Sequence, residues 1–291
     1  MNPNTIAITG ATGFIGSMLM SSLKQQGYKV LPLGRNELAG SIDQMREKLD
    51  GCWAVINLAG APIIQRWSTK NKEAMVKSRI QTTKKLVEAI NLCVAPPKVF
   101  ISASAVGIYT DNQVQTESHC KLSTGFAAQL CQDWEAESNK ARTETRVVNP
   151  RIGIVLGTAA GALPKMLPAF RLGIGGTIGD GKQFFPWIHI DDLLTAFLYL
   201  IKTHSLAGPV NMVAPERITN KQFTQQLAKT LNRPAFIPIP AFALKLLYGE
   251  GASTLTQGQE VIPEKLLLAG FKFRYASIDR ALTDLISSKW F

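Results

Sequence analysis

Short apolar runs alternate with amphipathic segments along the first half of the chain. Runs of four or five largely apolar residues are typical of strands that are buried on both faces. They lie at 6–9, 29–33, 54–58, 99–102 and 146–149. Apolar residues recur at helical spacing in three segments between them, at 14–26, 70–92 and 125–141. The alternation predicts a Rossmann-type, doubly wound parallel sheet of the α/β class, in which Pro32 marks an irregular or weakly paired strand position.

The second half of the chain has a different texture. Glycine and proline are frequent in residues 157–187, where one short helix is expected near 166–172, and a second helix is expected at 191–201. The tail from Thr219 mixes two or three helices with a strand-like run at 236–239. We therefore expect a smaller, mixed C-terminal cap domain. The predicted division gives 1–155 to the Rossmann domain, with 188–215 returning to it, and 156–187 and 216–291 to the cap.

Composition excludes several classes of protein. The 291 residues are 46% hydrophobic and 18% charged, and no apolar run is long enough to span a bilayer. The N-terminus lacks the basic region of a secretory signal, so a cytoplasmic protein is expected. The four cysteines form no C-x-x-C pair and are expected to be buried thiols, and the three histidines lie too far apart for a zinc motif, so no metal is expected.

The net charge of +11 is spread along the chain. Residues 1–151 carry 18 basic and 12 acidic side chains, and residues 152–291 carry 14 and 9. This dispersion, without basic blocks, argues against nucleic-acid binding and favours a basic solvated surface. A positive field would also attract a polyanionic cofactor or a phosphorylated small-molecule substrate.

A glycine-rich turn is the strongest chemical signal. Gly10, Gly13 and Gly16 follow the first predicted strand and open the first helix, a context in which the spacing indicates dinucleotide binding. Such glycines allow a tight turn, close approach of a pyrophosphate, and close packing of helix on sheet. The predicted cofactor contacts in this turn are Gly10, Thr12, Gly13, Phe14, Ile15 and Gly16.

The end of the second predicted strand favours NADP(H) over NAD(H). Gly34 and Arg35 follow that strand, where an acidic residue would suit a ribose 2′-hydroxyl and an arginine suits a 2′-phosphate. Glu37 lies two residues further on and is interpreted as a helix-start residue. Leu58, Ala59 and Gly60 end the next strand and are expected cofactor contacts, and the small size of Ala59 and Gly60 would let the chain pass close to the adenosine.

These strings resemble the extended short-chain dehydrogenase/reductases. The resemblance rests on residues 9–16, 57–60 and 102–105, and it is narrowed to the NAD(P)-dependent epimerase family, YfcH-like branch, by residues 166–173, 186–192, 211–215 and 269–271. It implies bound NADP(H) and a cap over the active-site cleft. By position it adds Arg79, Pro150 and Arg151 to the cofactor contacts, although Arg79 could equally be a surface residue of a basic helix.

The sequence lacks one catalytic motif that is typical of the family it resembles. Extended members use a serine after the fifth strand with a Y-x-x-x-K pair on the next helix, in which the lysine lowers the pKa of the tyrosine. Ser104 matches the serine, but the helix has neither tyrosine nor lysine, and Gly125 and Gln129 stand at the expected positions. Tyr109 is the predicted substitute catalytic residue.

Three candidate groups near the expected cleft each have a plain structural alternative. Trp187 and His189 are predicted substrate contacts, and Asp191 is a further titratable candidate. For Tyr109 and His189 the favoured interpretation is a packed core residue, and for Asp191 it is an N-cap. The sequence thus predicts an NADP(H)-dependent oxidoreductase or nucleotide-sugar epimerase with an atypical site. A non-catalytic NADP(H)-binding redox sensor is the alternative, and the oligomeric state stays open.

Overall fold

A parallel sheet forms the centre of the computed structural model, which describes residues 4–287. Six strands run in the spatial order β10-β7-β4-β3-β1-β2, and β5 also pairs with β7. The strands are β1 (Thr5–Thr9), β2 (Lys29–Leu33), β3 (Ala54–Asn57), β4 (Val99–Ser102), β5 (Ser104–Ala105), β7 (Arg146–Ile152) and β10 (Gly208–Met212). Every pairing is parallel, and β2 lies at an edge, which accommodates Pro32.

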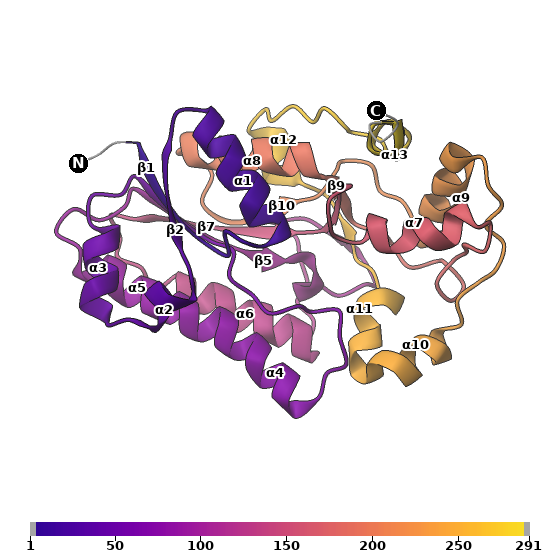
Figure 1. Ribbon diagram of the computed structural model, residues 1–291, viewed down its shortest axis with the longest axis horizontal. Coiled ribbons are helices and arrows are strands. Elements are labelled where there is room, and N and C mark those ends of the chain that lie inside the picture. The colour runs from indigo at the N-terminus through magenta and orange to yellow at the C-terminus, as the bar shows by residue number, and fades with distance from the viewer. Residues whose placement is uncertain (1–3, 288–291) are drawn as a thin grey trace.

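Helices cover both faces of the sheet. In Figure 1, α1 (Phe14–Gln25) and α8 (Ile190–Lys202) lie above the sheet, and α3 (Ile42–Leu49), α5 (Thr82–Leu92) and α6 (Phe126–Ser138) lie below it. Side chains alternate along β1 accordingly: Ile6 and Ile8 join the core under α1 and α8, whereas Ala7 joins the core under α3 and α5. The predicted doubly wound α/β class is confirmed.

The predicted helix at 70–92 is one continuous rod with an interruption. It comprises α4 (Thr69–Val76), a π-helical turn (Lys77–Gln81) and α5. A π turn inserts an extra residue into the helical repeat and changes the direction in which neighbouring side chains point. The interruption falls on Arg79, one of the predicted cofactor contacts.

The C-terminal half builds a second core beside the sheet. The short strands β8 (Ile154–Leu156) and β9 (Trp187–His189) pair in parallel, and β6 (Val114–Gln115) pairs with β11 (Glu260–Val261). Besides α8, this half contains α7 (Leu163–Arg171), α9 (Asn220–Leu231), α10 (Ala241–Tyr248), α11 (Ser253–Thr256), α12 (Glu264–Leu268) and α13 (Ile278–Ser287). Figure 1 shows α7, α9 and α10 grouped to the right of the sheet, and α7, α9 and α13 enclose buried side chains such as Leu167, Phe223 and Leu282.

Two expectations from the sequence need correction, one in each half of the chain. The run at 236–239 is not a strand, because Pro238 and Pro240 lack the N–H groups that a ladder needs, and only an isolated bridge joins Ile239 to Ile178. Cys120 is exposed, whereas the other three cysteines are buried as expected.

Residues 190–212 return to the sheet: α8 contacts α1, and β10 pairs with β7. Within residues 4–287 no helix is long and apolar enough to cross a membrane.

Candidate functional site

The candidate site lies at the carboxyl ends of the parallel strands. Thr9 is in register with both Leu33 and Asn57, so the segments that follow β1, β2 and β3 leave the sheet at the same edge. The chain proceeds from β1 to β2 on one side and then to β3 on the other. Such a reversal is the switch point where ligands bind open α/β sheets.

The glycine turn is shaped by contacts that exclude side chains. Gly10 has φ of +68°, and a Cβ atom placed on it would lie 2.6 Å from the carbonyl oxygen of Leu58. A Cβ on Gly16 would lie 2.1 Å from the carbonyl oxygen of Gly10, which also accepts the amide of Gly13 at 3.0 Å. The turn therefore packs closely against the end of β3, and neither Gly10 nor Gly16 has room for a side chain.

The first turn of α1 presents backbone donors without side-chain competition. Its N-cap is Gly13, no side chain caps it, and no acidic residue lies in its first turn. The unpaired N–H groups and the positive end of the helix dipole suit a pyrophosphate. The Phe14 ring lies under the loop after β8, where Cβ atoms on Gly157 and Gly161 would be 2.6 and 3.0 Å from it.

A buried polar network fixes the loop after β3. The Thr9 hydroxyl donates to the Asn57 side-chain oxygen at 2.7 Å and accepts the amides of Leu58 and Ala59, each at 3.2 Å. Asn57 in turn donates to Thr83 of α5 at 2.8 Å. The backbone at Leu58 and Ala59 is therefore held rigidly beside the glycine turn.

Arg79 reaches from the π turn across this loop. Its Nη2 donates to the carbonyl of Ala61 at 3.0 Å, and its guanidinium carbon lies 5.3 Å from the centre of the Trp134 ring. Its Nη1 is buried and has no hydrogen-bond partner among the residues that the structure describes. Burial lowers the pKa of this guanidinium. A buried, unsatisfied cationic donor beside Gly60 fits an anionic ligand.

Arg35 opens α2 (Arg35–Ala39) directly after Gly34 and is exposed. Its guanidinium has no hydrogen-bond or ion-pair partner among residues 4–287. Glu37 does not occupy the ribose position, because its carboxylate accepts the amide of Gly34 at 2.8 Å, as a helix-start residue does. The backbone hydrogen bonds hold the pKa of Glu37 below its usual value.

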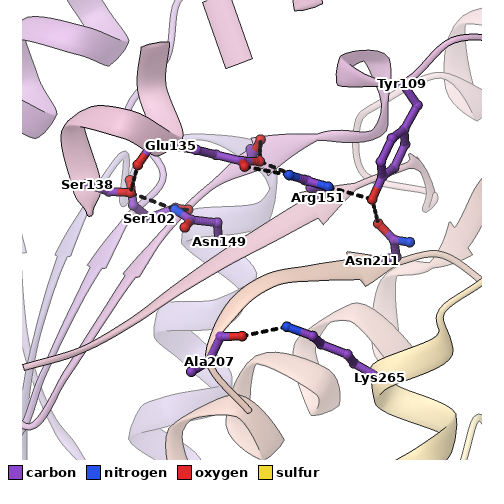
Figure 2. A network of polar contacts seen from close by, with 10 residues as sticks. Ser102, Tyr109, Glu135, Ser138, Asn149, Arg151, Ala207, Asn211 and Lys265 are labelled. Atoms are coloured by element: carbon purple, nitrogen blue, oxygen red, sulfur yellow. Dashed lines mark hydrogen bonds and ion pairs between the residues drawn. The ribbon is translucent and has the colours of Figure 1, made fainter. Parts of the chain in front are cut away.

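Ser104 and Tyr109 belong to one buried chain of polar groups. The Ser104 hydroxyl donates to Glu135 at 2.6 Å, and Arg151 binds the same carboxylate through Nε at 2.8 Å and Nη2 at 2.7 Å. Arg151 also donates to the Tyr109 oxygen at 2.8 Å, and that hydroxyl donates to Asn211 at 2.7 Å. Figure 2 shows Glu135, Arg151, Tyr109 and Asn211 joined in this sequence.

These contacts change how the predicted catalytic residues can act. Burial raises the pKa of the Tyr109 phenol to about 12, although Arg151 opposes the shift. The Glu135 carboxylate raises the pKa of Arg151 against the effect of burial. Ser104 and Tyr109 are only 4% and 1% exposed, and the Arg151 side chain is engaged by Glu135 and Tyr109. The Arg151 side chain is thus occupied within the protein and Pro150 lies buried in β7, and the cofactor contact expected of the segment 150–151 stays a prediction.

The Trp187 segment is also buried, and the substrate contacts expected of Trp187 and His189 stay a prediction. Trp187 is 0% and His189 1% exposed, so neither side chain faces an open cleft. His189, rather than Asp191, is the N-cap of α8, and its Nδ1 accepts the amide of Asp191 at 3.1 Å. Its ring stacks on Tyr275 with 3.8 Å between ring centres.

His189, Asp191 and Asp284 bring three potential metal ligands within 4.8 Å of one another. Because Nδ1 of His189 accepts a backbone N–H, the neutral ring carries its hydrogen on Nε2. That hydrogen points to Asp284, whose carboxylate lies 3.4 Å away. Neither ring nitrogen then has a free lone pair for a metal ion. Burial lowers the pKa of His189 and keeps the ring neutral.

Comparison with known proteins identifies the family. Residues 6–213 match the model of the NAD dependent epimerase/dehydratase family. The chain belongs to this family. Residues 239–285 match a second model, a domain of unknown function named DUF1731. The relation to the extended short-chain dehydrogenase/reductases is confirmed, and placement in the YfcH-like branch stays a prediction.

Several family members align along nearly the whole chain. The human epimerase family protein SDR39U1 is 36% identical over 97% of this chain and 99% of its own length. The chloroplastic homologue of Arabidopsis thaliana is 36% identical over 97% of this chain and 86% of its own. The crystal structure of human SDR39U1 with NADPH has a TM-score of 0.91 at 34% identity, covering 97% of this chain and 99% of that one. A nucleoside-diphosphate sugar epimerase of Corynebacterium glutamicum has a TM-score of 0.80 at 30% identity, covering 98% and 59%.

Helix α6 shows how this family member departs from the Y-x-x-x-K pattern. Gln129 is exposed, and its amide donates to Asp133 on the outer face of the helix. The inward positions near Ser104 are instead Cys131 and, one turn later, Glu135. Placing the missing pair at Gly125 and Gln129 is therefore wrong for Gln129, which points away from the serine. Burial raises the pKa of the Cys131 thiol to about 11.

Sequence reasoning missed Glu135, Asn57, Thr83 and Asn211 as organising residues. Each is a polar side chain within an otherwise apolar helix face or strand. Asn57 and Asn211 are fully buried, and Glu135 is 8% exposed. These residues could have been found in the sequence as polar positions inside apolar runs, because a polar residue that is buried requires a hydrogen-bond partner.

Proposed function

We propose that this chain binds NADP(H), in preference to NAD(H), at the switch point between β1 and β3. The observation that carries the proposal is the Gly10–Gly16 turn, which is closed against Leu58 and opens an uncapped helix. The human relative whose crystal structure contains NADPH supports it. Arg35 supports the choice of the phosphorylated cofactor, since a guanidinium fits a 2′-phosphate and Glu37 is engaged elsewhere.

The residues present allow each part of such a cofactor to be held. The first turn of α1 would bind the pyrophosphate, Arg35 the 2′-phosphate, and the backbone at Leu58 and Ala59 would lie against the adenosine. Arg79 would place a cationic donor beside Gly60, where its Nη1 lacks a partner. A bound nicotinamide ring would donate or accept the hydride in a redox reaction.

We further propose that the protein is an oxidoreductase or epimerase whose proton transfer does not use a Tyr/Lys pair. Ser104 directs its hydrogen to Glu135, so toward a substrate its oxygen can only accept a hydrogen bond. Tyr109 keeps its proton at neutral pH. The proposed substrate is a small carbonyl or hydroxyl compound, nucleotide sugars among them.

A second candidate function is a non-catalytic NADP(H)-binding redox sensor. The enclosed state of Ser104 and Tyr109 favours it, because a sensor needs cofactor occupancy and no proton relay. Transfer of deuterium from labelled NADPH to a panel of carbonyl compounds and nucleotide sugars separates the two. Transfer to any compound supports the enzyme. NADPH binding without transfer to any compound supports the sensor, and absence of NADPH binding overturns both proposals.

A further inference from the structure

An unusual concentration of apolar side chains is exposed on the cap. The described residues with large exposed apolar side chains include eight from two short stretches, 172–174 and 236–247. These eight residues, here called the cap apolar surface, are Leu172, Ile174, Phe236, Ile237, Ile239, Phe242, Leu246 and Leu247. Isolated exposed apolar residues are ordinary, whereas a contiguous group on a folded protein marks an interaction site.

Backbone contacts make the two stretches neighbours. Ile237 and Ile239 donate their amides to the carbonyls of Gly175 and Thr177, at 3.3 and 2.7 Å. The chain then enters α10 through Pro240. Leu244 is the buried residue of this helix, while Phe242 and Leu246, one turn apart, are 75% and 76% exposed. The surface is thus a continuous ribbon and helix face whose apolar side chains point into solvent.

The charges in the segments that carry this surface are mostly positive. Residues 163–182 and 229–249 contain six basic side chains, all exposed, and they are Lys165, Arg171, Lys182, Lys229, Arg233 and Lys245. The acidic residue of these ranges, Asp180, lies 3.6 Å from Lys182. Glu250, just beyond them, pairs with Lys72 at 2.5 Å. Arg233 donates to the carbonyl of Arg171 at 3.1 Å, so two of the cations stand at the rim together.

The exposed apolar side chains and the surrounding positive charge favour one kind of binding partner for the cap apolar surface. A second copy of the same face would bring two cationic rims together, which opposes self-association. Nucleic acid would leave the leucines and phenylalanines without partners. Exposed Phe and Leu interspersed with Lys and Arg are the pattern of segments that lie in the interface of an anionic lipid bilayer.

We propose that the cap apolar surface docks this protein reversibly onto membranes that carry anionic lipids. Phe242 and Leu246 enter the boundary between headgroups and acyl chains, and Lys245 and Arg233 contact the lipid phosphates. The protein lies on the bilayer and does not cross it, in keeping with the absence of a spanning helix in residues 4–287. This inference is independent of the cofactor proposal.

Flotation of the full chain with lipid vesicles tests the proposal. Vesicles of phosphatidylcholine alone are compared with vesicles that also contain phosphatidylglycerol, at low and high salt. We expect about tenfold more protein to float with the anionic vesicles, and salt to release it. Phe242→Ser with Leu246→Ser should abolish flotation, and Lys245→Glu should weaken it. Leu92→Ser with Val94→Ser, also exposed apolar residues but distant in the chain, is the control.

Each other outcome overturns the proposal. Equal flotation with both kinds of vesicle would remove the role of the cations. Absence of flotation, with a concentration-dependent dimer that the Phe242→Ser change disrupts, would assign the surface to a second copy. Loss of flotation in the Leu92 and Val94 control would show that binding is not specific to the cap. Thermal unfolding of every variant confirms that the exposed substitutions leave the fold intact, and Lys245→Glu gives an independent readout if the double variant does not fold.

Discussion

The Ser104 hydroxyl donates its hydrogen to the Glu135 carboxylate, 2.6 Å away across the face between β5 and α6. In the Y-x-x-x-K pattern the corresponding serine points to the reacting oxygen of a substrate. Here the serine hydroxyl is directed to the carboxylate on α6, and Arg151 donates two further hydrogen bonds to that carboxylate. In this protein the serine is part of a buried ion-pair network.

Removal of Glu135 should destabilise the fold strongly. Glu135→Ala would leave the Arg151 guanidinium, whose side chain is 6% exposed, without its counter-charge. A buried charge that loses its partner costs about 3 to 5 kcal/mol. Chemical denaturation should therefore show a lower free energy of unfolding by that amount.

Asp133→Ala is the matched control for Glu135→Ala. Asp133 lies on the same helix but on its exposed face, where it accepts a hydrogen bond from Gln129. Its removal should change the free energy of unfolding by about 0.5 kcal/mol or less. Similar losses for the two variants would show that the buried pair has no special role in stability.

Tyr109 should lose its proton only at high pH, and the free energy of unfolding should fall as the pH rises through this range. Its pKa rises from 10.0 to about 12, so the unfolded chain loses this proton before the folded protein does. The shift contributes about 3 kcal/mol of stability, which is complete below about pH 10 and is lost as pH rises toward about 12. Tyrosinate absorbance, compared between the protein and Tyr109→Phe, should show the missing step at about pH 12.

The comparison with Tyr109→Phe is necessary because a second tyrosine, Tyr275, also has a raised pKa. Burial and Asp284 raise the pKa of Tyr275 to about 12 as well, so the late step of the whole protein contains both phenols. In denaturant the Tyr109 step should move to about pH 10. A Tyr109 step near neutral pH in the folded protein would contradict the network and restore this residue as a proton donor.

Local patterns predict the sheet and the turn, while the site chemistry depends on distant contacts. The run of Ile6 to Thr9 followed by Gly10 is readable because strand, turn and helix follow one another in sequence. Glu135 and Arg151 meet only because α6 packs on β5 and β7, so no spacing announces their pairing. His189 looks like a titratable site residue in sequence, and its role as an N-cap depends on the local backbone of α8.

Gly16→Ala should damage cofactor binding through the turn. The added methyl would lie 2.1 Å from the carbonyl oxygen of Gly10, so turn and helix must separate. We expect about tenfold or greater loss of NADPH affinity, since the amides of the turn would no longer converge on a pyrophosphate. Gly107→Ala, whose methyl meets no atom within 4 Å, should bind NADPH normally in the same fluorescence titration. Normal binding by Gly16→Ala would place the cofactor elsewhere.

Arg35 should decide between the two nicotinamide cofactors. Arg35→Glu replaces the cation at the end of β2 with a carboxylate, which repels a 2′-phosphate and suits a free ribose hydroxyl. NADPH affinity should fall by about tenfold to a hundredfold, as expected for a lost charge-assisted hydrogen bond, while NADH affinity should hold or rise. Lys24→Glu, the same charge reversal in the last turn of α1, controls for the long-range field and should affect both cofactors slightly and equally. Equal losses for NADPH and NADH in Arg35→Glu would remove the 2′-phosphate assignment while leaving the glycine turn as the dinucleotide site.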